Sequence, residues 1–431
     1  MALTVFLLTF GLMFLLGYPI VFGMIAGGIL YFLVTGLDLS NLIDILVIHF
    51  SAQDVLIAVP LFIFTANVMN DTDITRKLFD FVQKAMGGVR GGLGYANIVA
   101  SIIFAGMSGS EIADVSGIGN IEIKAMMDAG YDGKFACAVT AASATIGPII
   151  PPSIPMVIYS MLTGVSLGYL FLAGFLPGLL LGFFEMVMVY VLSRVRNYPK
   201  GEKVPFPMLL KAFWNSLPAL LAPAILLIGI YGGVFTATEA AAIVAGYVII
   251  ISFLIYKSLG WKKLYKILIK SAESVGYISF IVASAYIVTY VVAREHVAEQ
   301  LTRIFIESGM LSNKILLLLS INLLYFILGM FIDVSIIQLV VIPMIFPLVQ
   351  AAGIDPVHFG IITTVNLMMA LDTPPYGQTG YITSALSGTP LREVFKEMIV
   401  YWIPIEVAAL MVITFWPDFV LFLPRLFGYS G

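Results

Sequence analysis

Charged side chains are scarce in this sequence, and their scarcity sets the class of protein. They make up 11% of its 431 residues, against 60% for hydrophobic ones. A soluble domain carries roughly 25% charged residues. The mean hydropathy is +1.03, and apolar runs extend from Leu3 to Phe427. The sequence therefore predicts an all-α polytopic membrane protein in contact with the lipid bilayer, with no sizeable soluble domain.

Cysteine is also scarce, and nucleotide-binding motifs are missing. Cys137 is the only cysteine, which excludes an intramolecular disulfide and argues against a thiolate metal site. No Walker motif occurs, so a primary ATP-driven pump is not expected. The net charge of −3 says little about partners, and no nucleic-acid partner is expected.

Basic residues are absent from three long windows, 91–123, 135–193 and 315–391. A carboxylate bound among these residues must be balanced by helix N-termini, hydroxyl groups and co-bound cations, because no Lys or Arg is present. The windows therefore favour cation-coupled transport of an anion.

The windows also contain an internal repeat. A shift of 223 residues places Gly106-Met107 on Gly329-Met330 and Pro151-Pro152 on Pro374-Pro375. Gly and Pro punctuate structure, so matches at these positions indicate a repeated fold. We assign residues 1–210 to the first repeat and residues 211–431 to the second.

Each repeat combines a short hairpin with a broken helix. Re-entrant helical hairpins are predicted at 91–127 and 312–350, because each turns at a glycine and polar residues and its arms are barely long enough to cross a bilayer. Broken helices are predicted at 133–163 and 357–387, where paired prolines interrupt the helix. One such pair could be a simple kink. Two at matched positions favour a site, since the exposed carbonyl groups suit a hard cation and the free N–H groups suit a carboxylate.

The other apolar segments complete the predicted topology. Further spans are expected at 3–34, 43–69, 166–193, 215–234, 237–256, 271–292 and 397–424, with surface helices at 72–87, 206–214 and 258–270. The positive-inside rule places the N-terminus and the three Lys/Arg-rich loops in the cytoplasm. The leading spans of the two repeats, 3–34 and 237–256, then run in opposite directions. This predicts inverted repeats, the build of secondary transporters whose substrate sites lie near the bilayer midplane.

The hairpin tips and helix breaks carry specific motifs. They read Gly106-Met107-Ser108-Gly109-Ser110 and Gly147-Pro148-Ile149-Ile150-Pro151-Pro152 in the first half, and Gly329-Met330-Phe331-Ile332-Asp333 and Thr373-Pro374-Pro375-Tyr376-Gly377 in the second. These motifs resemble those of the large membrane subunits of TRAP (tripartite ATP-independent periplasmic) transporters, and the similarity covers nearly the full length. The resemblance implies an elevator-type transporter with scaffold and transport domains, driven by a sodium gradient in the cytoplasmic (inner) membrane of a bacterium or archaeon.

The same resemblance implies partners and a substrate class. The expected partners are a small TRAP membrane subunit and a periplasmic substrate-binding protein. The expected substrate is an organic acid, such as a C4-dicarboxylate or a sialic acid. Asp372 departs from the family pattern, in which an uncharged residue precedes the second Thr-Pro-Pro.

One sodium site is expected in each repeat, where an oxygen-rich tip faces a break. The first comprises Ser108, Ser110 and carbonyl groups near Gly147; the second comprises Gly329, Asp333 and carbonyl groups near Leu371 and Thr373. The residues expected to contact substrate are Ser110, Ser143, Ser153, Asn366, Thr373 and Tyr376. Among these, Ser153 and Thr373 are predicted to begin the two half-helices, whose N-termini supply partial positive charge. Ser143 and Asn366 occupy the same repeat position.

The acidic residues of the hairpins leave alternatives open. Asp333 lies in an apolar hairpin, which makes it a functional candidate, although a helix cap at the tip would also explain it. Glu111, Asp114 and Glu122 follow the first tip and are expected to cap helices or to be solvated.

Two other functions were weighed. An intramembrane serine protease could use Ser108, but it needs a histidine within reach of that serine. The chain offers only His49, His296 and His358, none in the middle of a later predicted span, so no enzyme activity is expected. A passive anion channel could also be lined by re-entrant loops, whereas paired helix breaks favour alternating access.

Overall fold

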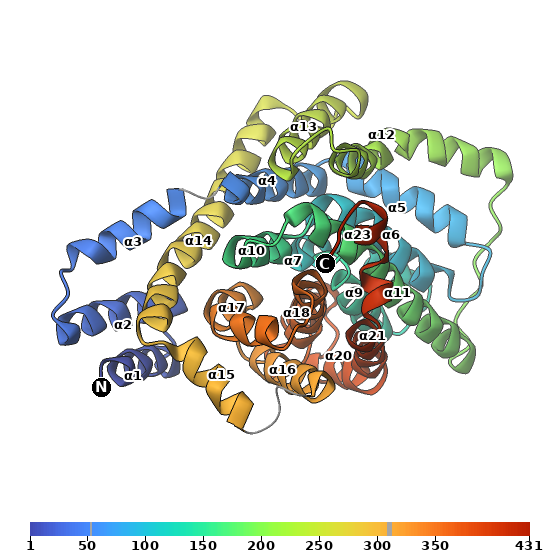
Figure 1. Cartoon of the computed structure of the whole chain (residues 1–431). Helices are drawn as coiled ribbons and strands as arrows, with labels where there is room; N and C mark the ends of the chain where they lie inside the picture. The colour runs from blue at the N-terminus through green and yellow to red at the C-terminus, as the bar shows by residue number, and fades with distance from the viewer. Residues whose placement is uncertain (52–53, 308–312) are drawn as a thin grey trace.

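The computed structural model describes residues 1–51, 54–307 and 313–431. Their regular secondary structure is helical, apart from an isolated β-bridge between Arg90 and Lys200. The helices form two groups, a frame and a core, visible in Figure 1. The frame comprises α1 (Ala2–Leu15), α2 (Ile20–Thr35), α3 (Ser40–Ser51), α4 (Ala58–Asp71), α5 (Asp73–Met86), α12 (Phe206–Tyr231), α13 (Ala237–Ile250), α14 (Trp261–Arg294) and α15 (Val297–Glu307).

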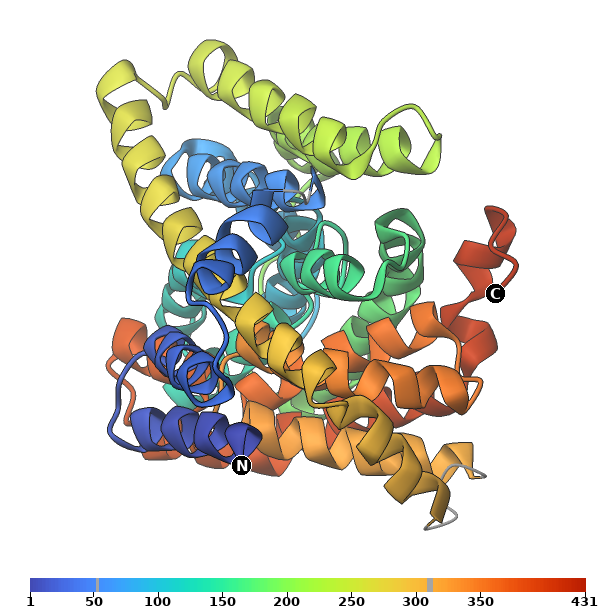
Figure 2. The same ribbon diagram turned by 60° about the vertical axis from the view of Figure 1, so that its left-hand side comes forward.

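The core lies beside the frame and holds both hairpins and both broken helices (Figures 1 and 2). It comprises α6 (Gly92–Ser108), α7 (Glu111–Asp114), α8 (Asn120–Asp128), α9 (Gly133–Ala144), α10 (Ile154–Thr163), α11 (Leu167–Val195), α16 (Lys314–Gly329), α17 (Val334–Ala351), α18 (Pro356–Leu371), α19 (Gln378–Ser387), α20 (Leu391–Glu397) and α21 (Ile403–Phe415). Two short helices, α22 (Pro417–Val420) and α23 (Phe422–Leu426), end the described chain.

Six of the described helical segments are long and apolar enough to cross a membrane. They are Leu167–Val195, Phe206–Tyr231, Ala237–Ile255, Trp261–Arg294, Val334–Ala351 and Leu391–Phe415. The predicted class, an all-helical polytopic membrane protein, is therefore confirmed.

The order of elements in the core occurs twice. The hairpin α6–α8 is followed by the broken helix α9/α10 and the long helix α11, and the hairpin α16/α17 is followed by α18/α19 and α20–α21. Helix pairs thus occupy both predicted hairpin segments, and both predicted broken helices are divided near their proline pairs, although residue 312 lies outside the described residues. Re-entrance of the hairpins and the inverted relation of the repeats stay predictions. The Pro151-Pro152 and Pro374-Pro375 peptide bonds, one in each break, are both cis.

Two predicted single spans are wrong. Residues 3–34 form the two helices α1 and α2, which separate at Gly17 and Pro19 and pack against each other. Glycine and proline there end one helix and start the next, which overrides the continuous hydropathy. Residues 43–69 are likewise divided between α3 and α4, with residues 52–53 outside the described chain.

Two predicted surface helices are also wrong as separate elements. Residues 206–214 begin the continuous helix α12, and most of residues 258–270 begin α14. The lysines in these segments lose little rotamer freedom in a helix and do not interrupt it, so the polar turns extend the apolar ones. The third predicted surface helix is present as α5, whose apolar residues Ile74, Leu78 and Val82 are buried on one face.

Candidate functional site

The first hairpin tip packs directly on the first helix break. The backbone N–H of Ile154, at the start of α10, donates to the Gly109 carbonyl oxygen over 3.4 Å. A Cβ atom added to Gly147 would lie 3.7 Å from the Ser110 carbonyl oxygen. The tip and the break therefore bring backbone oxygen atoms of both segments close together.

The second tip meets the second break in a similar way. The Tyr376 N–H donates to the Met330 carbonyl oxygen over 3.1 Å. A Cβ atom on Gly329 would come within 2.5 Å of the Ala370 Cβ. Glycine at this position lets α16 approach the end of α18 closely.

Hydroxyl groups at the first tip and break have different surroundings. The Ser108 Oγ is buried and has no hydrogen-bond partner in the part of the chain that the structure describes. The Ser110 Oγ accepts from the Ala113 N–H and caps α7. Ser153 caps α10, as predicted, accepting from the Met156 N–H at 3.2 Å and donating to the Pro148 carbonyl oxygen. Ser108 is thus the hydroxyl with spare bonding capacity.

Thr373 does not begin a half-helix, contrary to the prediction. It follows the end of α18, where its Oγ donates to the Met369 carbonyl oxygen over 2.9 Å. The next half-helix, α19, starts at Gln378 because Gly377 adopts a left-handed conformation that ends the turn. Asp333 caps α17 by accepting from the Ser335 N–H at 2.9 Å, which is the alternative that the sequence left open.

Broken helices that face hairpin tips in an apolar core are typical of secondary transporters. The comparison with known families also indicates a transporter. Residues 7–419 match the family described as "Tripartite ATP-independent periplasmic transporter, DctM component". The chain belongs to this family. It is therefore a TRAP large permease, as the tip and break motifs suggested.

Individual relatives support the assignment over most of the chain. The sialic acid TRAP transporter large permease protein SiaM of Vibrio cholerae is 38% identical over 89% of this chain and 91% of its own length. The C4-dicarboxylate TRAP transporter large permease protein DctM of Pseudomonas aeruginosa is 36% identical over 87% of each chain. Among solved structures, the YdaH transporter of Alcanivorax borkumensis covers 88% of the chain with a TM-score of 0.58 at 15% identity, which shows a shared fold alone.

The relatives are transporter permeases, which confirms that this TRAP large permease is not an enzyme. Two of the histidines that a protease would need have other contacts. The His358 ring is buried and its Nε2 lies 2.8 Å from the Ile413 carbonyl oxygen, while His296 pairs with Glu299. The side chain of His49 lies outside the described residues.

Ser143 of the TRAP large permease joins the first hairpin to the first broken helix. Its Oγ donates to Asn97 Oδ1 over 2.7 Å and lies 3.1 Å from the Ser101 Oγ. Asn97 in turn donates to Thr140 over 2.8 Å and to Glu122 over 2.6 Å. This buried network fixes α6 against α8 and α9.

Asn366 holds the equivalent position in the second half. Its Nδ2 donates to both the carbonyl and the side-chain oxygen of Asn322, each at 2.9 Å. Asn322 donates onward to Thr414 over 3.0 Å. Both predicted residues are therefore bonded to their own hairpins, and the direct hydrogen bonds they make here are structural.

The acidic residues past the first tip are buried, so the expectation of solvated side chains is wrong. Glu111, Asp114 and Glu122 are at most 3% exposed. The Glu111 carboxyl lies near that of Asp372, and neither Glu111 oxygen has a hydrogen-bond partner among the described residues. The contact joins the first tip to the second break, and Thr379 also donates to Asp372.

Sequence reasoning missed two further acids, Glu185 on α11 and Glu406 on α21. Both are buried on neighbouring helices, and their carboxyl oxygens have no hydrogen-bond partner in the described chain. The signal was available, because an ionisable residue inside an apolar helix is a functional candidate by default. The described residues contain no group of three or more His, Cys, Asp or Glu that could hold a metal ion.

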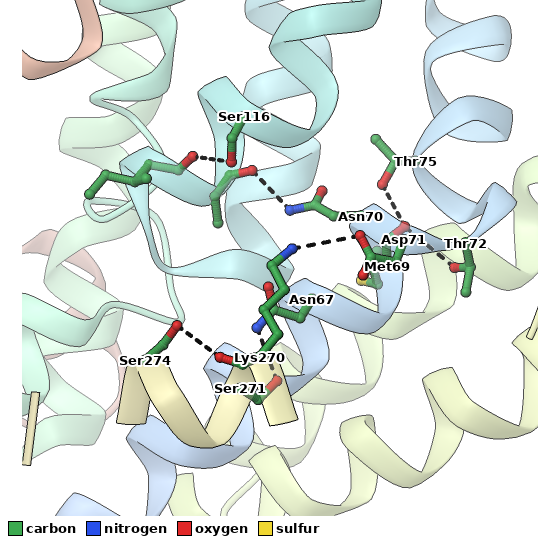
Figure 3. Close-up of polar contacts among 12 residues, drawn as sticks. Asn67, Met69, Asn70, Asp71, Thr72, Thr75, Ser116, Lys270, Ser271 and Ser274 are labelled. Carbon is green, nitrogen blue, oxygen red and sulfur yellow. Dashed lines mark hydrogen bonds and ion pairs between the residues drawn. The ribbon is translucent and has the colours of Figure 1, made fainter. Parts of the chain in front are cut away.

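A polar contact connects the frame to the first hairpin. Figure 3 shows Asn67 of α4 bonded to Ser271 of α14 at 2.9 Å and Asp71 paired with Lys270 at 3.7 Å. Asn70, also labelled in Figure 3, donates to the Ala113 carbonyl oxygen of the first hairpin over 2.9 Å. The end of α4 therefore touches both the frame helix α14 and the core.

Proposed function

We propose that the chain couples uptake of an organic acid to a sodium gradient across the cytoplasmic (inner) membrane. The observation that carries the proposal is that each hairpin tip is hydrogen-bonded to a broken helix in windows without Lys or Arg. Relatives named for sialic acid and for C4-dicarboxylates support a carboxylate substrate. In this proposal a periplasmic substrate-binding protein delivers the acid, and a small TRAP membrane subunit completes the transporter.

The first sodium ion is proposed to bind Ser108, Ser110 and carbonyl oxygens near Gly147. Support comes from the unpartnered, buried Ser108 Oγ and from the proximity of Ser110 to Gly147. Hard cations prefer oxygen ligands, and a buried hydroxyl without a partner costs free energy unless something binds it.

The second sodium ion is proposed to bind between Gly329, Asp333 and the carbonyl groups near Leu371 and Thr373. The Thr373 carbonyl oxygen already accepts from Gly377 at 3.1 Å. Its second lone pair remains available for a cation. The Met330–Tyr376 hydrogen bond supports the closeness of this tip and break.

The substrate carboxylate is proposed to lie between the two breaks. The N-terminus of α10 at Ser153, with the tip hydroxyl of Ser110, supplies donors and partial positive charge. Thr373 and Tyr376 contribute from the second break. Ser143 and Asn366 act in this scheme mainly as positioning residues, because their hydrogen bonds fix each hairpin to its broken helix.

Transport is proposed to follow an elevator motion of the core against the frame, with inverted repeats supplying the two access states. The frame and the core each contain helices from both halves of the sequence. Such an arrangement would let the core move as one unit against the frame. The Asn70–Ala113 contact would break and re-form in each cycle.

Removal of sodium is the experiment that tests this function. The transporter, reconstituted with its small subunit and binding protein, is expected to lose uptake by about 100-fold when potassium replaces sodium, because the bound cations balance the substrate charge. Substrate should tighten sodium binding by the same factor, as linkage requires. Uptake that follows the substrate gradient equally well in potassium would indicate a passive channel instead.

Thr373→Ala tests the part of the second break in substrate binding, because it removes the Thr373 hydroxyl and keeps the carbonyl group proposed for the second ion. Loss of this hydroxyl is expected to raise the substrate KM about tenfold, the effect of losing one hydrogen-bonding group. Thr364→Ala is the matched control, because Thr364 is also buried on α18 and makes the same bond to the carbonyl four residues back, at 2.9 Å. Equal shifts in the two variants would count against a local role for Thr373.

A further inference from the structure

An open groove of about 660 Å³ runs beside the second helix break, on the side of α20. Its walls are largely apolar and include Pro374, Pro375 and Phe395. Tyr381, Ile399 and Val400 also line it and are about half exposed. An exposed apolar wall of this kind on a membrane protein suits a hydrocarbon chain better than water.

Two cationic side chains line this groove, and neither has an ion-pair partner among the described residues. Arg392 and Lys396 line it from one face of α20, a single helical turn apart, and both are exposed. None of the groove's lining residues is acidic. Neither cation forms a salt bridge with a described residue, since the nearby Glu397 pairs with Arg196 and Glu393 lines a different cavity. The groove therefore combines positive charge with an apolar surface.

The Arg196–Glu397 ion pair indicates at which end of the membrane helices the groove lies. The Arg196 Nη1 and the Glu397 Oε1 are 2.5 Å apart. Arg196 follows the end of α11, in the basic segment that the proposed orientation places in the cytoplasm. Glu397 ends α20, so Arg392 and Lys396 lie near the same boundary. Basic pockets between membrane helices on the cytoplasmic side bind anionic lipid headgroups.

We propose that this groove binds one anionic phospholipid of the surrounding bilayer. The phosphate lies between Arg392 and Lys396, and an acyl chain follows Tyr381, Ile399 and Val400. Charge complementarity with two unpaired cations selects the anionic headgroup, and the apolar wall selects a lipid over a small soluble anion. The inference rests on the proposed function only for the cytoplasmic placement of α20.

The bound lipid touches the helix that braces the second break. A Cβ atom on either Gly377 or Gly380 would lie 2.5 Å from the Phe395 ring, so this ring packs directly on the start of α19. Phe395 lies between Arg392 and Lys396 on α20. A lipid that holds α20 in place therefore supports the half-helix at the proposed ion and substrate site.

The test compares two double variants of the transporter purified with its small subunit. Arg392→Gln/Lys396→Gln is expected to weaken retention of phosphatidylglycerol roughly 30-fold, since each basic residue near an anionic lipid contributes about a fivefold preference. Lys262→Gln/Lys266→Gln is the matched control, because these lysines are exposed, one turn apart on α14 and do not line the groove. Retention is measured by native mass spectrometry from phosphatidylcholine nanodiscs doped with phosphatidylglycerol.

Lipid retention is measured without sodium or substrate, so failure of sodium coupling would leave this result intact. Equal retention by the groove variant and the control would overturn the proposal, as would wild-type protein that retains no phosphatidylglycerol. A substrate KM raised only in the groove variant, in vesicles of pure phosphatidylcholine, would instead assign the groove to the substrate anion.

Discussion

Gly109→Ala is expected to abolish measurable uptake while leaving the protein folded. Gly109 has φ +59°, and a Cβ there would lie 2.8 Å from the Pro152 carbonyl oxygen. The left-handed conformation costs an alanine about 1–2 kcal/mol, and forcing an atom into a packed contact costs about 1–3 kcal/mol more. The contact between tip and break should therefore weaken by about 30- to 4000-fold, given that 1.4 kcal/mol is about tenfold.

Gly164→Ala separates backbone strain from this clash. Gly164 has φ +72°, but a Cβ there would meet no atom within 4 Å. Its variant should lose thermal stability to a similar extent through strain while keeping sodium-driven uptake. Both quantities can be measured on the same reconstituted samples. Uptake by the Gly109 variant at the level of the Gly164 variant would refute the importance of the first tip.

Arg196→Met is expected to lower the free energy of unfolding by about 3–5 kcal/mol, because it leaves the Glu397 carboxylate buried without its partner. The two side chains are 17% and 4% exposed. Arg196 also donates to the Tyr198 hydroxyl, which in turn donates to Asp132 over 2.9 Å. Burial raises the pKa of the Tyr198 phenol, so it remains protonated and keeps this bond.

Two further variants make the stability test specific. Arg194→Met removes an exposed cation that lies 4.2 Å from the centre of the Tyr190 ring, a contact that contributes about 0.5–1 kcal/mol. Arg196→Met combined with Glu397→Leu should recover most of the lost stability, since no charge is then buried alone. Denaturant unfolding in detergent measures all three. A double variant as unstable as the single one would show that the ion pair is not the cause.

Glycine and proline explain why the tips and breaks could be predicted from sequence. Their backbone restrictions act locally, so Gly109 and the two Pro-Pro pairs mark turns in any context. The same signal at Gly17 and Pro19 was outweighed by continuous hydropathy, and the division between α1 and α2 was missed. In α12, by contrast, proline does not end the helix, because Pro218 and Pro223 lie inside one continuous helix.

Contacts between the two halves could not be predicted, because they depend on packing across the core. Glu111 and Asp372 are far apart in sequence, and no pattern places their carboxyl groups together. The position of Thr373 was missed for a local reason. Gly377 delays the start of α19, so the proline pair ends α18 several residues before the next helix begins.

The length of α14 has a consequence for the membrane around the transporter. Its 34 residues extend about 51 Å, and residues 271–294, beyond the lysine-rich start, account for about 36 Å. A hydrocarbon layer of about 30 Å accommodates that stretch only if the helix tilts. Ser271 is bonded to α4, and Ile287 packs on Gly28 of α2, so a thinner bilayer would rotate these frame helices together. We therefore expect the acyl-chain length of the bilayer to set the tilt of the frame helices, and with it the direction of the proposed elevator motion of the core.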